Sequence, residues 1–119
     1  GEPLVIVEIG VFAGMLAYHL LKELDFIILI GVDPYIGSDG TFPGNFSDSL
    51  DPDLAMYKAM SVMEPYGSRA NLLHMSSEKA AAEIDFEIDA VFVDGCHLYD
   101  CVQQDFNLWR PKLRRGVET

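Results

Sequence analysis

Short apolar segments alternate with segments of helical periodicity along this chain, and that alternation limits its fold more than any other feature. Apolar runs rich in β-branched residues predict buried strands, and the helical segments between them begin at recognisable capping residues. The predicted strands are Leu4–Ile9, Phe26–Val32, Asn71–Met75 and Ala90–Val93. The predicted helices are Met15–Leu24, one that starts at Asp51-Pro52, one from Ser76 or Ser77 to Ile84, and Tyr99–Trp109. We therefore expect an α/β fold, a Rossmann-like doubly wound parallel sheet in three α/β/α layers.

Length and charge narrow the class of protein further. The 119 residues suffice for one domain, residues 1–119, and carry a net charge of −11. An acidic chain is a poor partner for nucleic acid, and it is compatible with a small cationic ligand. The longest apolar run, Phe26–Val32, is far below the roughly 18 residues of a membrane span. Two cysteines and no visible signal peptide favour a cytoplasmic protein without a membrane partner.

The first strand is followed by a glycine-containing turn, Glu8-Ile9-Gly10-Val11-Phe12-Ala13-Gly14. In open α/β sheets, ligands bind beyond the carboxyl ends of the strands, where glycines bring backbone N–H groups close to them. The spacing of Gly10 and Gly14 differs from that of dinucleotide-binding turns and phosphate-binding loops, and no lysine follows Gly14. A turn that needs glycine only for its shape explains this segment equally well.

The second and third strands end in polar residues. Asp33 follows the second strand, 19 residues after Gly14, and an acidic residue there can accept hydrogen bonds from both hydroxyls of a ribose. Its alternative role is to start a turn before Pro34. Ser76 and Ser77 follow the third strand, where they could reach an adenine edge, cap the next helix, or do both.

The fourth strand leads into Asp94-Gly95-Cys96-His97-Leu98-Tyr99, a compact group of ionisable residues. His97 suits proton removal at neutral pH, and Asp94 could orient it or bind a divalent cation. His19 and His74 are predicted to be structural, since they fall within a helix and a strand. A zinc site at Cys96, His97 and Cys101 lacks a fourth ligand at normal spacing.

Three segments together resemble class I S-adenosylmethionine (SAM)-dependent methyltransferases, most closely the small-molecule O-methyltransferase-like group, methyltransferase domain family 24. They are Glu8–Gly14, Gly31-Val32-Asp33-Pro34-Tyr35 and Asp89–Tyr99, and Trp109 near the end of the last helix also fits. The resemblance implies a SAM-binding core and methyl transfer to the oxygen of a small-molecule acceptor.

The resemblance also implies a role for each matching position. Glu8, Gly10, Phe12 and Gly14 would line the methionine end of SAM, Asp33 would hold the ribose, and Tyr35 would border the adenosine pocket. Ser76 or Ser77 would lie near the adenine. Asp94 would lie beside the cofactor and corresponds to a magnesium ligand in metal-dependent relatives, and His97 would be the candidate base.

The sequence departs from the family pattern mainly in extent. It resembles about the first two-thirds of the family's fold, so we expect a sheet truncated after the fourth strand and its helix. The outer edge of that strand would need cover from further chain or from a second copy in a homo-oligomer. Two alternatives remain: a catalytically inactive SAM- or nucleotide-binding or interaction module, and half of a nicotinamide-binding oxidoreductase.

Overall fold

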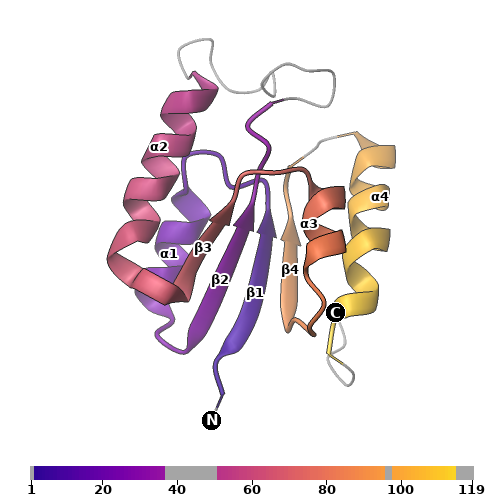
Figure 1. Ribbon diagram of the computed structural model, residues 1–119, viewed down its shortest axis with the longest axis horizontal. Helices are drawn as coiled ribbons and strands as arrows, with labels where there is room; N and C mark the ends of the chain where they lie inside the picture. Colours follow the sequence, from indigo (N-terminus) through magenta and orange to yellow (C-terminus); the bar gives the residue numbers. More distant parts are fainter. Residues whose placement is uncertain (1, 37–50, 96–97, 115–119) are drawn as a thin grey trace.

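The computed structural model describes residues 2–36, 51–95 and 98–114, and four parallel strands form its centre (Figure 1). They are β1 (Leu4–Ile9), β2 (Ile27–Val32), β3 (Ala70–Leu73) and β4 (Ala90–Val93). Their order in the sheet is β3-β2-β1-β4. The chain therefore moves outward from β1 to β3 and then returns to place β4 on the other side of β1. This reversal of direction beside β1 is where open α/β sheets bind ligands.

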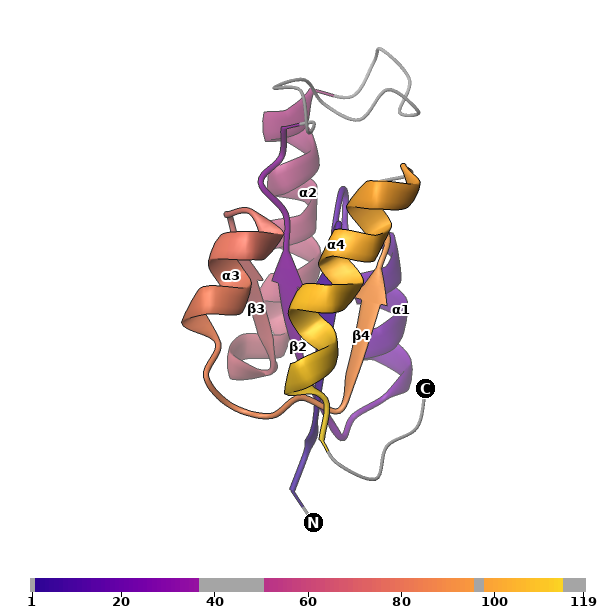
Figure 2. The same ribbon diagram turned by 90° about the vertical axis from the view of Figure 1, so that its right-hand side faces the viewer.

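The helices cover both faces of the sheet, which confirms the expected three-layer Rossmann-like fold (Figure 2). Helices α1 (Met15–Glu23) and α2 (Pro52–Met63) pack against each other on one face, and α3 (Ser77–Glu83) and α4 (Tyr99–Trp109) pack on the other. Short 3-10 turns follow α2 and α4, at Glu64–Arg69 and Arg110–Lys112. Within the described residues, no helix is long and apolar enough to cross a membrane.

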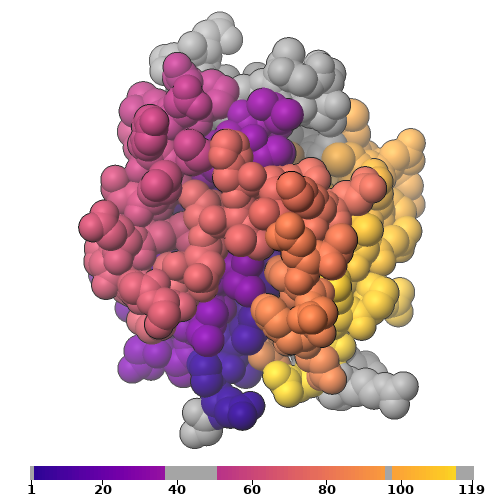
Figure 3. Space-filling view, in the orientation of Figure 1, coloured from indigo at the N-terminus to yellow at the C-terminus, as the bar shows by residue number. Residues whose placement is uncertain are grey.

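Each face of the sheet has its own hydrophobic core. On one side Ile6 and Leu29 pack against Ala17 and Leu21 of α1 and the end of α2. On the other side the core forms around Trp109, which is fully buried at the end of α4. Alternate residues of β1 and β2 point into the two cores, so these strands are buried on both faces. Figure 3 shows how α2, α3 and α4 form much of one side of the molecule's surface.

The outer strands are less covered than the sequence predicts. Continuous apolar runs led us to expect burial on both faces of all four strands, but β3 and β4 are only half-buried and Phe92 is 41% exposed. The reason is position, because an edge strand has neighbours on one side only. Part of the outer edge beyond β4 is nevertheless covered, since Leu113 forms a parallel bridge with Ile88 just before β4 begins.

Helix α2 begins as predicted, at an Asp51 cap in front of Pro52. The Asp51 side chain accepts a hydrogen bond from the Asp53 backbone N–H at 2.8 Å, which caps the helix in front of Pro52. The buried residues are Ala55, Ala59 and Met63. The larger side chains of Leu54 and Tyr57 are 45% and 59% exposed. Small side chains are needed here, because α2 passes close to Gly14.

Candidate ligand-binding site at the carboxyl ends of the strands

The turn after β1 adopts a backbone that only its glycines accept without strain. Gly10 has φ +92° and Gly14 has φ +90°, both in the left-handed region. The Gly10 N–H donates to the Val32 carbonyl at 2.8 Å, which ties this turn to the end of β2. Gly14 is the N-cap of α1 and offers no side chain to the helix's first N–H groups. The turn therefore leads the chain into a helix that begins without a side-chain cap.

Gly10 also lies directly against the turn after β4. A Cβ placed on Gly10 would come within 2.5 Å of the Gly95 Cα, far inside van der Waals contact. The Asp94 N–H donates to the Ile9 carbonyl at 2.8 Å, which fixes this approach. The sequence motifs that contain Gly10 and Asp94 are therefore adjacent in space, at the carboxyl ends of neighbouring strands.

Asp33 binds the backbone on both sides of the site. One carboxylate oxygen accepts from the Phe12 N–H at 2.9 Å and the other from the Tyr35 N–H at 2.7 Å. The residue is only 5% exposed, and this burial raises the pKa of its carboxyl although backbone N–H groups act in the opposite direction. The Val11 N–H also acts on this carboxylate as a third backbone donor, so little acceptor capacity remains. Asp33 therefore mainly holds the Phe12 and Tyr35 backbone segments together, and it can accept few further hydrogen bonds from a ligand.

Tyr35 completes this tie. Its hydroxyl donates to the Phe12 carbonyl at 2.8 Å, so Phe12 is held at both its N–H and its C=O. Phe12 and Tyr35 have φ of 55° and 58°, conformations that cost energy for residues other than glycine. The Asp33–Tyr35 pair holds both strained residues in place, and burial raises the Tyr35 pKa above its usual range. We call these three residues, Phe12, Asp33 and Tyr35, the backbone clamp.

His74 is a member of this edge that sequence reasoning missed. We placed it within a strand, but β3 ends at Leu73 and His74 follows it. Its Nε2 lies 3.2 Å from the Pro34 carbonyl, and its ring meets the Tyr35 ring edge-on at 5.9 Å between centroids. The polar run His74 to Glu78 could have signalled an earlier end to the strand.

Glu8 is the most unusual residue of the site. It is 2% exposed, and its Oε1 has no hydrogen-bond partner within the part of the chain that the structure describes. Burial, with smaller contributions from Asp94 and Asp33, raises its pKa to about 8. A carboxyl in this environment is largely protonated at neutral pH.

The structure describes only part of the turn after β4. Asp94 is exposed at the strand's end, while His97 and Cys96 lie outside the described residues, so the role predicted for His97 stays a prediction. No group of three or more His, Cys, Asp or Glu side chains within residues 2–36, 51–95 and 98–114 could hold a metal ion.

The two serines after β3 have structural partners. Ser76 caps α3 by accepting from the Lys79 N–H at 3.1 Å, and it is exposed at the edge where the strands end. Ser77 accepts from Trp109 Nε1 at 2.8 Å and hydrogen-bonds Asp105, which joins α3 to α4. Of the two, Ser76 is therefore the one that a ligand at this edge could contact.

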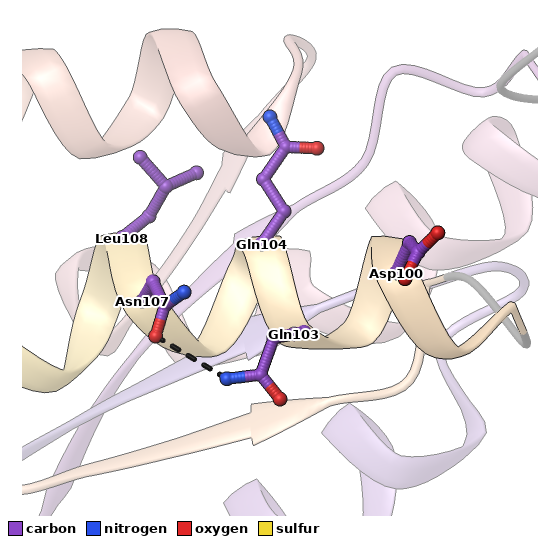
Figure 4. A pocket seen from close by; sticks show the side chains of 5 residues that line it. All are labelled: Asp100, Gln103, Gln104, Asn107 and Leu108. Carbon is purple, nitrogen blue, oxygen red and sulfur yellow. Dashed lines mark hydrogen bonds between the residues drawn. The ribbon is translucent and has the colours of Figure 1, made fainter.

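A surface hollow elsewhere on the molecule does not belong to this site. It lies along one side of α4 and is lined by Asp100, Gln103, Gln104, Asn107 and Leu108 (Figure 4). Gln103 donates to Asn107 at 3.4 Å, and the spacing of these residues is that of a single helix face. None of the residues predicted to bind a ligand lines it.

Fold and site together define a Rossmann-like α/β domain of the class I methyltransferase type. The chain belongs to methyltransferase domain family 24, whose sequence model, described as a methyltransferase domain, matches residues 7–117. This membership confirms the resemblance to class I methyltransferases and favours that class over the oxidoreductase alternative. A search among curated proteins found no match.

Solved methyltransferase structures share the fold. An rRNA methylase from Streptococcus thermophilus superposes with a TM-score of 0.61 at 13% identity, over 98% of this chain and 58% of its own length. The plantazolicin methyltransferase BamL, solved in complex with a triazolic desmethylPZN analog and SAH, superposes with a TM-score of 0.62 at 18% identity, over 96% of this chain. This chain spans 35% of the BamL chain. At these identities the likeness is one of fold.

Proposed function

We propose that this domain binds SAM at the carboxyl ends of β1, β2 and β4 and transfers its methyl group to an oxygen atom of a small molecule. The observation that supports this most is the convergence of Glu8, Asp33 and Asp94 on a glycine turn held by the backbone clamp. Membership in a methyltransferase family and the SAH bound to BamL agree with SAM as the cofactor.

The residues present fit such a cofactor. The buried Oε1 of Glu8, which has no partner in the part of the chain that the structure describes, suits a positively charged group, and Gly10 and Gly14 let a ligand approach the backbone. Together with Phe12, these residues would hold the methionine end. Asp33 would accept from a ribose hydroxyl through its remaining lone pairs.

Two further positions complete the proposed cofactor pocket. The Tyr35 segment would border the adenosine, and the exposed Ser76 would lie near the adenine. Both follow strands that end at the same edge of the sheet as β1.

The chemistry would require little more than alignment and removal of one proton. SAM supplies a methyl group on a sulfonium, and the protein would hold the acceptor oxygen in line with it. His97 would take the acceptor's proton, with Asp94 orienting it. Asp94 as a magnesium ligand stays a prediction, since no described side chains complete a coordination shell around it.

A small-molecule acceptor is favoured over RNA by charge. The chain carries 19 acidic and 8 basic residues, the reverse of what binding to a phosphate backbone requires. A catalytically inactive SAM-binding or interaction module is the alternative, because the chain spans only part of the solved methyltransferases that it resembles.

Calorimetric titration with SAM tests the proposed cofactor. We expect saturable binding that Asp33→Asn weakens at least tenfold, while the matched change Asp85→Asn at an exposed loop position leaves it unchanged. Circular dichroism would verify that both variants are folded. Failure of the folded wild-type protein to bind SAM would refute the proposal.

Turnover separates the two functions and the two kinds of acceptor. Labelled SAM would be incubated with a panel of catechols and other hydroxylated small molecules, and in parallel with a structured RNA. Methylated small molecules would support the proposed reaction, labelled RNA would contradict the acceptor, and SAM binding without any transfer would favour the inactive module.

A further inference from the structure

Glu8 occupies a position in which a negative charge has no counterpart. Its neighbours across the sheet are Gly31 on β2 and Phe92 on β4, so neither flanking position offers a hydrogen-bonding side chain. Ile6, two residues earlier on β1, packs in the core beneath α1, and alternation places Glu8 on the same face. The carboxyl is buried, and Oε1 has no hydrogen-bond partner among the described residues.

The ionisable groups around Glu8 are acidic. Asp94 at the end of β4 and Asp33 at the end of β2 both disfavour its ionisation, and the nearby Tyr35 is a neutral phenol. His74 beyond β3 acts on Asp33. The ionisable side chains of α1 and α2, the helices on this face, are exposed to solvent. No cation among the described residues acts on Glu8 itself, so within this part of the chain its charge is balanced only by a proton or by a ligand.

We propose that Glu8 makes the pocket select for positive charge on its cofactor: it is protonated in the empty pocket and releases its proton to solvent when a cationic group arrives beside it. The inference rests on the proposed function and adds the means of recognition. An ionised carboxylate facing a cation loses less by burial than a carboxylate alone, so binding and deprotonation favour each other. Cofactor affinity and proton release are then one coupled event.

Two groups of the cofactor could supply the charge, and three probe ligands distinguish them. SAM has an ammonium and a sulfonium, S-adenosylhomocysteine has the ammonium alone, and 5′-methylthioadenosine has neither. Proton release with SAM and S-adenosylhomocysteine assigns the ammonium as the partner of Glu8. Release with SAM alone assigns the sulfonium, and in that case the pocket favours the cofactor over its own product.

Calorimetry in buffers of different ionisation enthalpy measures the number of protons released. At pH 7 the wild-type protein should release close to one proton on binding SAM and none on binding 5′-methylthioadenosine. Glu8→Gln keeps the shape of the side chain without its proton, so it should abolish the release and weaken SAM at least tenfold. Glu83→Gln, at an exposed glutamate at the end of α3, should behave as the wild type.

The dependence of wild-type affinity on pH gives a second measurement that needs no variant. If binding releases one proton, the dissociation constant for SAM should fall close to tenfold per pH unit between about pH 5.5 and 7. SAM binding that is independent of both buffer and pH overturns this inference and leaves the proposed function standing. Proton release that persists in Glu8→Gln also overturns it, and absence of SAM binding overturns both.

Discussion

At the scale of single residues, the structure separates side chains that shape the site from those left to meet a ligand. Phe12, Asp33 and Tyr35 hold one another through three hydrogen bonds between 2.7 and 2.9 Å. Glu8 lies beside them, and its Oε1 has no hydrogen-bond partner among the described residues. The sequence marked all four as one set of cofactor residues, because their positions match a motif. A sequence motif gives only the positions of residues along the chain. The hydrogen-bond partner of each side chain depends on how the neighbouring strands pair.

The clamp can be tested at the Tyr35 hydroxyl. Tyr35→Phe removes the bond to the Phe12 carbonyl and leaves the ring in place. Because a part-buried hydrogen bond is lost, the free energy of unfolding should fall by about 1 kcal/mol. SAM affinity should fall severalfold, since the Phe12 segment is no longer held. Chemical denaturation and calorimetry measure the two effects, and an unchanged affinity in the destabilised variant would show that the clamp does not position the ligand.

Glu8 also predicts how stability depends on pH. Its folded-state pKa of about 8 lies above the unfolded value of 4.5, so folding binds a proton between these values. The contribution of Glu8 to the free energy of unfolding should therefore be constant below about pH 4.5. It should fall as the pH rises toward 8 and level off above pH 8.

The variant Glu8→Gln isolates this contribution. Denaturation curves at pH 5 and 8 should show that the wild type loses a few kcal/mol more stability than the variant over this interval. The comparison removes the effects of Asp33 and Asp105, whose pKa values are also raised by burial. Parallel pH profiles of the two proteins would mean that Glu8 is ionised in the folded state.

At the scale of elements, the site depends on two turns that touch. Gly10→Ala would place a methyl group within 2.5 Å of the Gly95 backbone, in a conformation that alanine already disfavours. Gly67→Ala is a matched control, because Gly67 also has a positive φ of 58° but nothing lies within 4 Å of its added Cβ. The control should cost about 1–3 kcal/mol of stability, because φ 58° with ψ −131° is strained for alanine, and Gly10→Ala clearly more, with loss of SAM binding. Thermal unfolding measures this difference. Equal losses of stability in the two variants would show that the two turns can move apart at little cost in free energy.

The contact between α3 and α4 gives a prediction about Ser77. Ser77→Ala leaves Trp109 Nε1 and the 8%-exposed Asp105 without this partner, so stability should fall by about 1–3 kcal/mol. SAM affinity, measured by calorimetry on the folded variant, should stay within about twofold, because the hydroxyl lies between helices. Loss of affinity without loss of stability would restore the adenine role first predicted for Ser77.

Much of the element pattern could be predicted from the sequence, and the exceptions have physical causes. The bounds of β1, β4 and α4 agree with the apolar runs and with the helical stripe that ends at Trp109. The packed face of α2 could not be read from the apolar pattern, because burial there follows the close approach of Ala59 to Gly14 and not hydrophobicity alone. The neighbours of Glu8 required the sheet order, which comes from pairing between distant strands.

At the scale of the whole molecule, the outer side of β4 is the surface with the clearest need of a partner. β4 pairs with β1 on one side. On the other side, within the described residues, the chain covers only its approach, through the Ile88–Leu113 bridge. Asp89 strengthens this corner by accepting from the Val5 N–H and from Arg114, both at 2.8 Å. The remaining unpaired strand edge and the exposed Phe92 ring form an apolar border to the sheet.

We predict that this 119-residue chain self-associates through that border. Sedimentation velocity over a range of concentrations should show a reversible dimer, because pairing of two β4 edges satisfies backbone groups that are otherwise left to water. Phe92→Lys places a charge at the border and should shift the equilibrium toward monomer, whereas Phe86→Lys, at another exposed phenylalanine outside the strands, should not. Dimers that withstand Phe92→Lys would place the interface elsewhere, and a monomer at every concentration would show that water alone satisfies this edge.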